Sequence, residues 1–227
     1  MRVTLAVVEA ALLDAGLTPR GAFHPKPEDA VPDMAPACAA GTVVLAGNAG
    51  GRMWRAFAAE RDPARETLDD WSREKLDAVS AALGGRALYP FEAPYLPFQR
   101  WARLAEACHP SPLGMFVHPE YGLWHGYRGA VALAERLELP ALAATASPCD
   151  SCAAKPCLAA CPVDAFGADG YDVAACVGHL ETPAGAECMA EGCRARRACP
   201  VGTDYRYEPA QAAFHMRAFL AAHRYRN

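Results

Sequence analysis

The sequence predicts an α+β protein in two parts, an α/β domain over residues 1–147 and a second domain over 148–227 that ends in a helix. Three observations predict this division. The length of 227 residues suits one large domain or two small ones. Apolar residues make up 52% and charged residues 21%, so the chain can bury a core. The first part alternates helical and strand patterns, whereas cysteines concentrate in the second.

The opening stretch MRVTLAVVEAALLDAGL predicts an amphipathic helix, because Leu5, Val8 and Leu12 recur at helical spacing. Glu9 and Asp14 interrupt the apolar run that a signal peptide needs. The chain also has no apolar run of about 18 residues, the minimum for a membrane helix. We therefore expect a cytoplasmic protein with no membrane partner.

Further elements follow along the first domain. Residues 24–38 contain four prolines and predict an irregular loop, and TVVLAG (42–47) predicts a buried strand. The glycines at 47–51 predict a tight turn, with contact to a cofactor as the alternative, since no G-x-G-x-x-G spacing or Walker lysine is present. Further helices are predicted at 52–60, 68–83 and 97–107, with a strand at 86–91. The aromatic-rich stretch 111–129 predicts two short strands around a turn, either in the core or beside a flat cofactor.

Eight of the ten cysteines lie between Cys149 and Cys199. A disulfide framework suits a small secreted chain, whereas this chain is larger and no export signal is predicted. Clustered thiols in a reducing compartment indicate metal or redox chemistry. The runs CDSCAAKPCLAACP and CMAEGCRARRACP each end in a Cys-Pro pair, with Cys176 between them.

This order predicts two [4Fe–4S] clusters, in which the cysteine of each Cys-Pro pair ligates the cluster of the other run. Proline after the ligand ends the preceding helix, because it has no N–H to donate. The alternatives are one cluster or a zinc site, but only one C-x2-C pair is present and zinc does not account for two Cys-Pro pairs. By count and symmetry, cluster I would use Cys149, Cys152, Cys157 and Cys199, and cluster II would use Cys161, Cys176, Cys188 and Cys193.

Two further sets of residues flank or lie outside this motif. Lys155 and the arginines at 194, 196 and 197 would raise the potential of a nearby cluster, or would be solvated charges on a turn. Cys38 and Cys108 are expected to be ordinary small residues rather than ligands.

The two Cys-Pro motifs with an isolated cysteine and ACVGHLE between them resemble the iron–sulfur region of epoxyqueuosine reductases and related cobalamin-dependent reductases. HPEYGLWHGYRG (118–129) resembles the HP-x-x-G-x-W strand pair of those reductases and a stretch of the CblC-type cobalamin-processing proteins. GTVVLAGNAGGRMWRAF and DPARETLDDWSREKL resemble the start of the CblC-type module, so the likeness spans about residues 40–205. It implies a nitroreductase-like, CblC-type α/β sandwich followed by a dicluster ferredoxin module.

The same resemblance implies a cobalamin held near His118, Gly122, Trp124 and Arg128. The sequence departs from the reductases at the acid that delivers a proton, since Phe91 stands at that position and Glu92 is adjacent to it. The G-W-x-G-K-N segment is missing. Only 28 residues follow Cys199, which leaves no room for the helical repeats that hold tRNA. Queuosine synthesis on tRNA is therefore not expected.

Two functions follow from these patterns. The first is an oxidoreductase in which the clusters relay single electrons to a cobalamin, in a cobalamin-dependent or cobalamin-processing reaction; a flavin (FMN) is the less favoured cofactor. The second is a ferredoxin-type carrier or subunit that docks on a partner enzyme without cobalamin. The expected partners are an external donor of the reduced ferredoxin or flavodoxin type and a small-molecule or corrinoid ligand. The net charge of −4 gives no reason to expect a nucleic acid.

Overall fold

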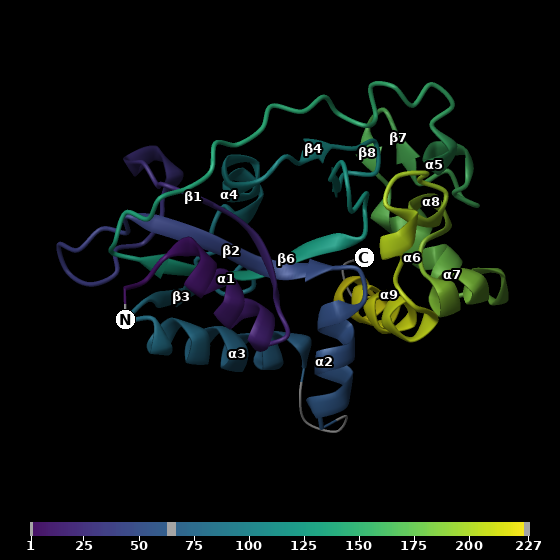
Figure 1. The fold of residues 1–227 in the computed structure, drawn as a ribbon. Helices are drawn as coiled ribbons and strands as arrows, with labels where there is room; N and C mark the ends of the chain where they lie inside the picture. Colours follow the sequence, from purple (N-terminus) through teal and green to yellow (C-terminus); the bar gives the residue numbers. More distant parts are fainter. Residues whose placement is uncertain (1, 63–66, 225–227) are drawn as a thin grey trace. The chain divides into compact units, whose positions relative to one another are not determined.

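The structure, a computed structural model, describes residues 2–62 and 67–224. It divides into two compact units (Figure 1). Unit 1 comprises Met1–Ala107 and His125–Ala144, and unit 2 comprises Cys108–Trp124 and Thr145–Asn227. Both helices and strands are present, as the α+β prediction requires. Within the described ranges, no helix combines the length and the apolar character that crossing a membrane demands.

Unit 1 is built on an antiparallel sheet of four strands in the order β1-β2-β6-β3. The two central strands read VVLA and GAVAL, small and β-branched residues that pack between layers on both faces of a sheet. Residues 42–48 are buried without interruption, which confirms the predicted buried strand. The bounds are β1 (Thr18–Phe23), β2 (Thr42–Ala49), β3 (Arg86–Leu88) and β6 (His125–Leu133).

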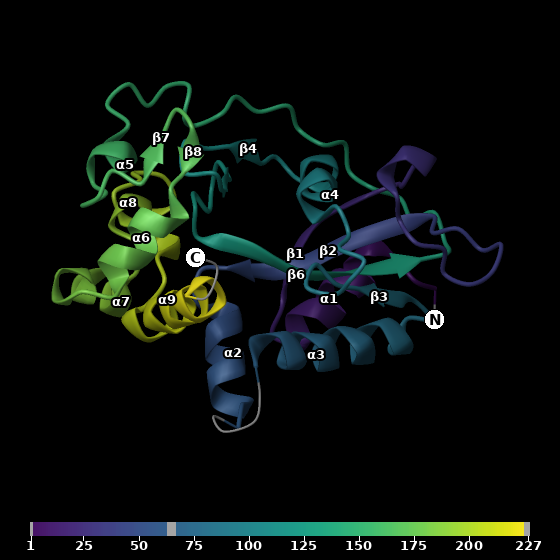
Figure 2. The same ribbon diagram turned by 180° about the vertical axis from the view of Figure 1, so that it is seen from behind.

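Four helices cover this sheet: α1 (Leu5–Asp14), α2 (Arg52–Glu60), α3 (Leu68–Ala82) and α4 (Phe98–Ala105). Helix α3 begins at a capping box, in which the Thr67 hydroxyl accepts from the Asp70 N–H at 3.1 Å. The turn after α1 lies against α2 and α3, and Gly16 (φ +83°) is needed there because a Cβ would lie 2.7 Å from Ala56. Helix α4 lies on the side of the sheet opposite to α3 (Figures 1 and 2).

The tight turn predicted at 47–51 is shorter in the structure, because residues 47–49 complete β2 and only Gly50 and Gly51 join it to α2. Gly50 has a positive φ of 62°, which glycine adopts without strain. A Cβ at Gly47 would lie 1.9 Å from the carbonyl oxygen of Gly126 on the neighbouring strand. Close strand packing therefore accounts for the glycine at position 47.

The predicted ends of two elements in unit 1 need correction. The strand predicted at 86–91 ends at Leu88, and the helix predicted at 97–107 ends at Ala105. The stretch 111–129 contains two strands around a turn, as predicted, but they have different partners. The first, β5 (Phe116–Val117), pairs with β4 (His109–Pro110), whereas β6 joins the sheet of unit 1. Residues 108–124 thus pack in unit 2, although the sequence assigned them to the first domain. The 147/148 boundary remains a prediction about where independent domains divide.

Unit 2 consists of short elements around a small apolar core. Leu113, Val117 and Leu123 pack against Cys157 and Cys199. Short turns of helix alternate with loops, so the backbone can approach a compact group from several directions. The elements are α5 (Pro156–Ala159), β7 (Phe166–Gly167), β8 (Gly170–Tyr171), α6 (Val173–Leu180), η2 (Pro183–Gly185), α7 (Ala186–Glu191), α8 (Arg194–Arg197), η3 (Thr203–Tyr205) and α9 (Pro209–His223).

A buried ion pair joins β1 to the segment after α4. The Arg20 side chain has no exposed surface, and its guanidinium donates to the Glu106 carboxylate from Nε at 3.1 Å and from Nη2 at 2.6 Å. Nη1 donates to the carbonyl of Asn48 at 2.8 Å, and the Tyr127 hydroxyl donates to Glu106. Each member therefore depends on the others for its hydrogen bonds.

We predict that Arg20→Met lowers the free energy of unfolding of unit 1 by about 3–5 kcal/mol, because it leaves the Glu106 carboxylate buried without its cation. Urea denaturation followed by tryptophan fluorescence measures this change. The control is Arg224→Met, whose pair with Glu181 is exposed and worth about 1 kcal/mol or less. Equal losses in the two variants would contradict the prediction.

Candidate functional site

The eight cysteines from Cys149 to Cys199 gather in unit 2 as two groups of four. We call these thiol group I and thiol group II. In group I, Cys149 and Cys157 interact electrostatically with each other and with the remaining two thiols. In group II, Cys176 interacts with Cys161 and Cys188, Cys193 interacts with Cys176 and Cys188, and all four line one cavity. Group I contains Cys149, Cys152, Cys157 and Cys199, and group II contains Cys161, Cys176, Cys188 and Cys193.

The two Cys-Pro cysteines exchange between the groups. Helix α5 ends at Ala159 and Cys161 follows it, whereas α8 ends at Arg197 and Cys199 follows it. Each proline comes directly after its cysteine and ends the local helix. Cys161 therefore leaves the first run and joins group II, while Cys199 leaves the second run and joins group I. The structure brings the thiols together in the combinations that the sequence suggested, and ligation of iron remains a prediction.

Burial raises the pKa of the thiols at Cys149, Cys157, Cys176 and Cys193, and the charges of neighbouring thiols raise it further. Desolvation disfavours the thiolate, and like charges in one site disfavour one another. These four thiols therefore hold their protons more tightly than an isolated cysteine does. A bound metal compensates the thiolate charge, so binding releases protons.

The thiol groups do not by themselves distinguish zinc from an iron–sulfur cluster. In the described ranges 2–62 and 67–224, no three His, Cys, Asp or Glu side chains are already placed around one metal ion. A zinc site binds four ligands at one ion, whereas a [4Fe–4S] cube binds each thiolate at a separate corner. The preference for clusters rests on the two Cys-Pro pairs of the sequence.

Thiol group II lines a cavity of about 450 Å³ within unit 2. Most of its other walls are apolar, including Leu113, Phe166 and Phe219. His179, on α6, also lines this cavity, and its Nε2 is buried with no hydrogen-bond partner among the residues that the structure describes. A buried imidazole nitrogen without a partner is costly, by about 1–3 kcal/mol. The sequence analysis did not single out His179, because its burial depends on contacts that α6 and α9 make in the fold.

The three arginines of α8 have different environments. Arg197 pairs with Glu187 and Glu191 at the surface, and Arg194 lies 3.9 Å from Glu187. Arg196 instead donates to the carbonyl of Leu123 from Nε at 3.0 Å. Charge compensation at the surface therefore accounts for Arg194 and Arg197, whereas Arg196 forms no ion pair with a carboxylate of the described residues.

Arg196 also lies against two aromatic rings of unit 2. Its guanidinium carbon is 4.6 Å from the ring centroid of Trp124 and 4.5 Å from that of Tyr207. Such cation–π contacts stabilise a desolvated guanidinium. Through these contacts Arg196 connects residues 123–124 to α8, the helix that precedes Cys199. Cys199 is one of the candidate ligands in thiol group I.

The four residues predicted to hold a cofactor are divided between the two units. His118, Gly122 and Trp124 lie in unit 2, and Arg128 lies in unit 1. Gly122 (φ +57°) is required by packing, since a Cβ would lie 2.0 Å from the carbonyl oxygen of Val201. His118 Nδ1 accepts hydrogen bonds from two backbone N–H groups of its own turn, at 3.1 and 3.2 Å.

Trp124 and Arg128 likewise have internal contacts. The Trp124 side chain is 2% exposed and packs on Tyr207. Arg128 donates to the Asp69 carboxylate and to the Ser72 hydroxyl. These contacts give all four residues structural roles, and their contact with a cofactor remains a prediction.

Phe91 and Glu92, which stand at or beside the position of the acid in the reductases, also make contacts within the protein. Phe91 stacks on Tyr89 with ring centroids 5.3 Å apart, and the guanidinium carbons of Arg73 and Arg128 lie 5.5 and 5.3 Å from its ring. Glu92 pairs with Arg73. The structure therefore places cation–aromatic packing, and no free carboxylate, at this point of the described chain.

Comparison with known proteins identifies a shared fold. No family model matches the chain, and no curated protein matches its sequence. A solved epoxyqueuosine reductase in complex with an epoxyqueuosine-modified tRNA stem loop aligns with a TM-score of 0.53 at 18% identity, over 91% of this chain and 69% of that one. The Bacillus subtilis enzyme, with a catalytic loop swung out of its active site, aligns with a TM-score of 0.52 at 18% identity, over 91% of this chain and 69% of that one. The Streptococcus thermophilus enzyme aligns with a TM-score of 0.52 at 14% identity, over 93% of this chain and 70% of that one.

At these identities the comparison establishes the fold alone. The chain shares the fold of epoxyqueuosine reductases, as the resemblance in the cysteine motifs suggested. The cofactors and the substrate of those enzymes are not carried over by fold, because one fold supports several chemistries.

The exchange of the two Cys-Pro cysteines predicts that replacing either one damages the cluster held by the other run. Cys199→Ser should perturb the cluster held by the first run, and Cys161→Ser should perturb the cluster held by the second. Electron paramagnetic resonance of each reduced variant after anaerobic loading identifies the altered signal. Cys38→Ser, outside both groups, serves as the control and should leave both signals unchanged. A purely local pattern, in which each Cys-Pro cysteine affects only its own run, would show the exchange to be wrong.

Proposed function

We propose that this protein is an iron–sulfur oxidoreductase that relays single electrons through two [4Fe–4S] clusters. The observation that supports the proposal is the gathering of eight thiols into two groups of four, with one Cys-Pro cysteine exchanged in each direction. Cluster I would be held by thiol group I and cluster II by thiol group II. Each cluster, when bound, accepts and returns one electron.

The residues around thiol group II fit such a group. The cavity offers about 450 Å³ beside four thiols, and its apolar walls would exclude water from an iron–sulfur core. Exclusion of water and N–H donors directed at sulfur are two means by which a protein sets a cluster's potential. His179 Nε2 lines the same cavity and could supply one such donor.

A corrinoid is the electron acceptor that we propose first, because the cysteine order and the stretch 118–129 resemble those of cobalamin-dependent reductases. The four residues predicted to contact it have internal roles, so this part of the proposal rests on the sequence resemblance and not on observed contacts. We derive no reaction step through the corrinoid. The alternative acceptor is a partner enzyme, in which case the chain is a ferredoxin-type carrier.

The expectation that no nucleic acid binds is opposed by the comparison. One of the structural neighbours was solved with a tRNA stem loop. The net charge of −4 was the reason for that expectation, and a net charge does not describe a local phosphate-binding face. We propose a small-molecule or corrinoid ligand first, with a tRNA stem loop as the alternative that this neighbour supports, and the experiment below distinguishes them.

The test is an anaerobic optical titration of the cluster-loaded full chain with cob(II)alamin. We expect the corrinoid spectrum to shift toward the base-off form, and the cobalt to be reduced when a flavodoxin-type donor is added. No spectral change at high micromolar concentration would remove the corrinoid and leave the carrier function. A change with FMN instead would identify a flavin protein, and a salt-sensitive gel shift with a tRNA stem loop would overturn the choice of substrate class.

His179 gives a prediction that does not depend on the acceptor. A donor to a cluster sulfur stabilises the reduced, more negative state, so His179→Leu should lower the midpoint potential of cluster II. His179→Gln retains an N–H donor and should stay closer to the unmodified protein. A redox titration followed by electron paramagnetic resonance measures these potentials.

The control for this prediction is His109→Leu, because His109 bonds to the Thr145 hydroxyl at 3.0 Å outside the cavity. Iron content must match in all variants. Equal potentials in the leucine and glutamine variants and the unmodified protein would show that His179 does not donate to cluster II.

A further inference from the structure

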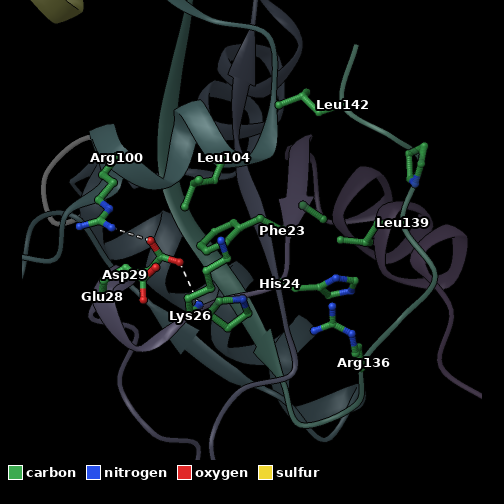
Figure 3. Close-up of a pocket in the computed structure, with 13 residues that line it drawn as sticks. Phe23, His24, Lys26, Glu28, Asp29, Arg100, Leu104, Arg136, Leu139 and Leu142 are labelled. Atoms are coloured by element: carbon green, nitrogen blue, oxygen red, sulfur yellow. Dashed lines mark hydrogen bonds and ion pairs between the residues drawn. The ribbon is translucent and has the colours of Figure 1, made fainter. Parts of the chain in front are cut away.

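A separate cavity of about 600 Å³ lies within unit 1, outside the cysteine-rich unit (Figure 3). Its size falls within the range of small-molecule sites, about 300–1,000 Å³. Three segments form its walls: residues 22–29 after and at the end of β1, one face of α4, and residues 136–142 after β6. None of these segments contains a residue used in the proposed function.

Hydrogen bonds hold the three walls in place. The Trp101 indole N–H donates to the carbonyl of Asp29 at 2.8 Å, and Arg100 pairs with the Asp29 carboxylate at 3.0 Å. His24 Nε2 lies 2.9 Å from the carbonyl of Leu137, which can only accept, so this nitrogen carries the proton. A cavity whose walls are fixed in this way loses little conformational entropy when a ligand binds.

The cavity presents apolar side chains to solvent. Phe23 forms part of its lining, and Leu104 and Leu142 keep 39% and 51% of their surface exposed. Exposed apolar area that is gathered in a concave site commonly marks a place for an apolar ligand. Figure 3 shows these side chains around the same hollow as the charged ones.

Charge around the cavity favours an anion. The lining contains three basic side chains and two carboxylates, which leaves one net positive charge when His24 is neutral. Asp29 is 3% exposed, and its carboxylate forms an ion pair with Arg100. Lys26 and Arg136 form no ion pair with any residue in the described ranges.

From this juxtaposition we propose that the cavity binds a monoanionic amphiphile, an aryl or acyl monocarboxylate. The apolar body would lie against Phe23, Leu104 and Leu142, and the carboxylate would accept hydrogen bonds from Lys26 or Arg136. Apolar contact supplies the affinity, and the single net charge selects a carboxylate over a neutral molecule of the same shape. This site goes beyond the proposed electron relay and does not require it.

The test uses calorimetric titration of the full, cluster-loaded chain with 1-naphthylacetate and with its neutral counterpart 1-naphthylacetamide. We expect saturable binding of one carboxylate per chain, with the amide about tenfold weaker because it lacks the charge-assisted hydrogen bonds. Arg136→Gln should weaken carboxylate binding about fivefold or more while leaving amide binding unchanged. Leu104→Asn should weaken both.

The matched control is Arg103→Gln, which removes an equal charge from an exposed position of α4 outside the cavity lining. It should leave both affinities unchanged, with the same thermal midpoint and iron content as the other variants. Absence of saturable binding, equal affinity for acid and amide, or an equal effect of Arg103→Gln and Arg136→Gln would each overturn the proposal. Because the readout is binding in unit 1, its failure leaves the electron relay untouched.

Discussion

The architecture of unit 2 depends on one constraint, the convergence of four thiols from two separate stretches of chain. Cys199 must reach the first cysteine run, and Cys161 must reach the second. Neither group is complete without a residue from the other run, so the two runs cannot fold as independent loops. The core of Leu113, Val117 and Leu123 packs directly on Cys157 and Cys199, which couples this small hydrophobic cluster to the geometry of group I. In a unit with so small an apolar core, bound clusters would add binding free energy to folding.

Unit 1 is stabilised in a different way. Residues 42–48 of β2 and 129–133 of β6 are buried, and a fully buried arginine is matched by a carboxylate, a carbonyl and a histidine. Arg20 Nη2 lies 3.0 Å from Nδ1 of His125, and because a guanidinium only donates, that nitrogen accepts and the imidazole proton is on Nε2. A single polar network thus connects β1, β2 and β6 at one end of the sheet, where apolar packing alone would leave these groups without hydrogen bonds.

Much of the local structure could be predicted from the sequence, because the signals are local. The β-branched run at 42–47 and the amphipathic pattern over 68–83 correctly placed β2 and α3. The cysteine spacing also suggested the two groups of thiols. The two strands predicted in 111–129 are present, but their partners were not predicted, because alternation indicates a strand without identifying what it pairs with. Arg20, Glu106 and His179 gave no signal, since each acquires its role through contacts between residues far apart in the chain.

The central claim is that two thiol groups hold two clusters. It is tested most directly by counting iron, acid-labile sulfide and zinc in anaerobically loaded protein, with the absorbance near 400 nm followed on reduction. Two cubes require about eight iron and eight sulfide per chain and bleaching by dithionite. About four iron per chain, or zinc at the stoichiometry of a tetrahedral site, would contradict the account.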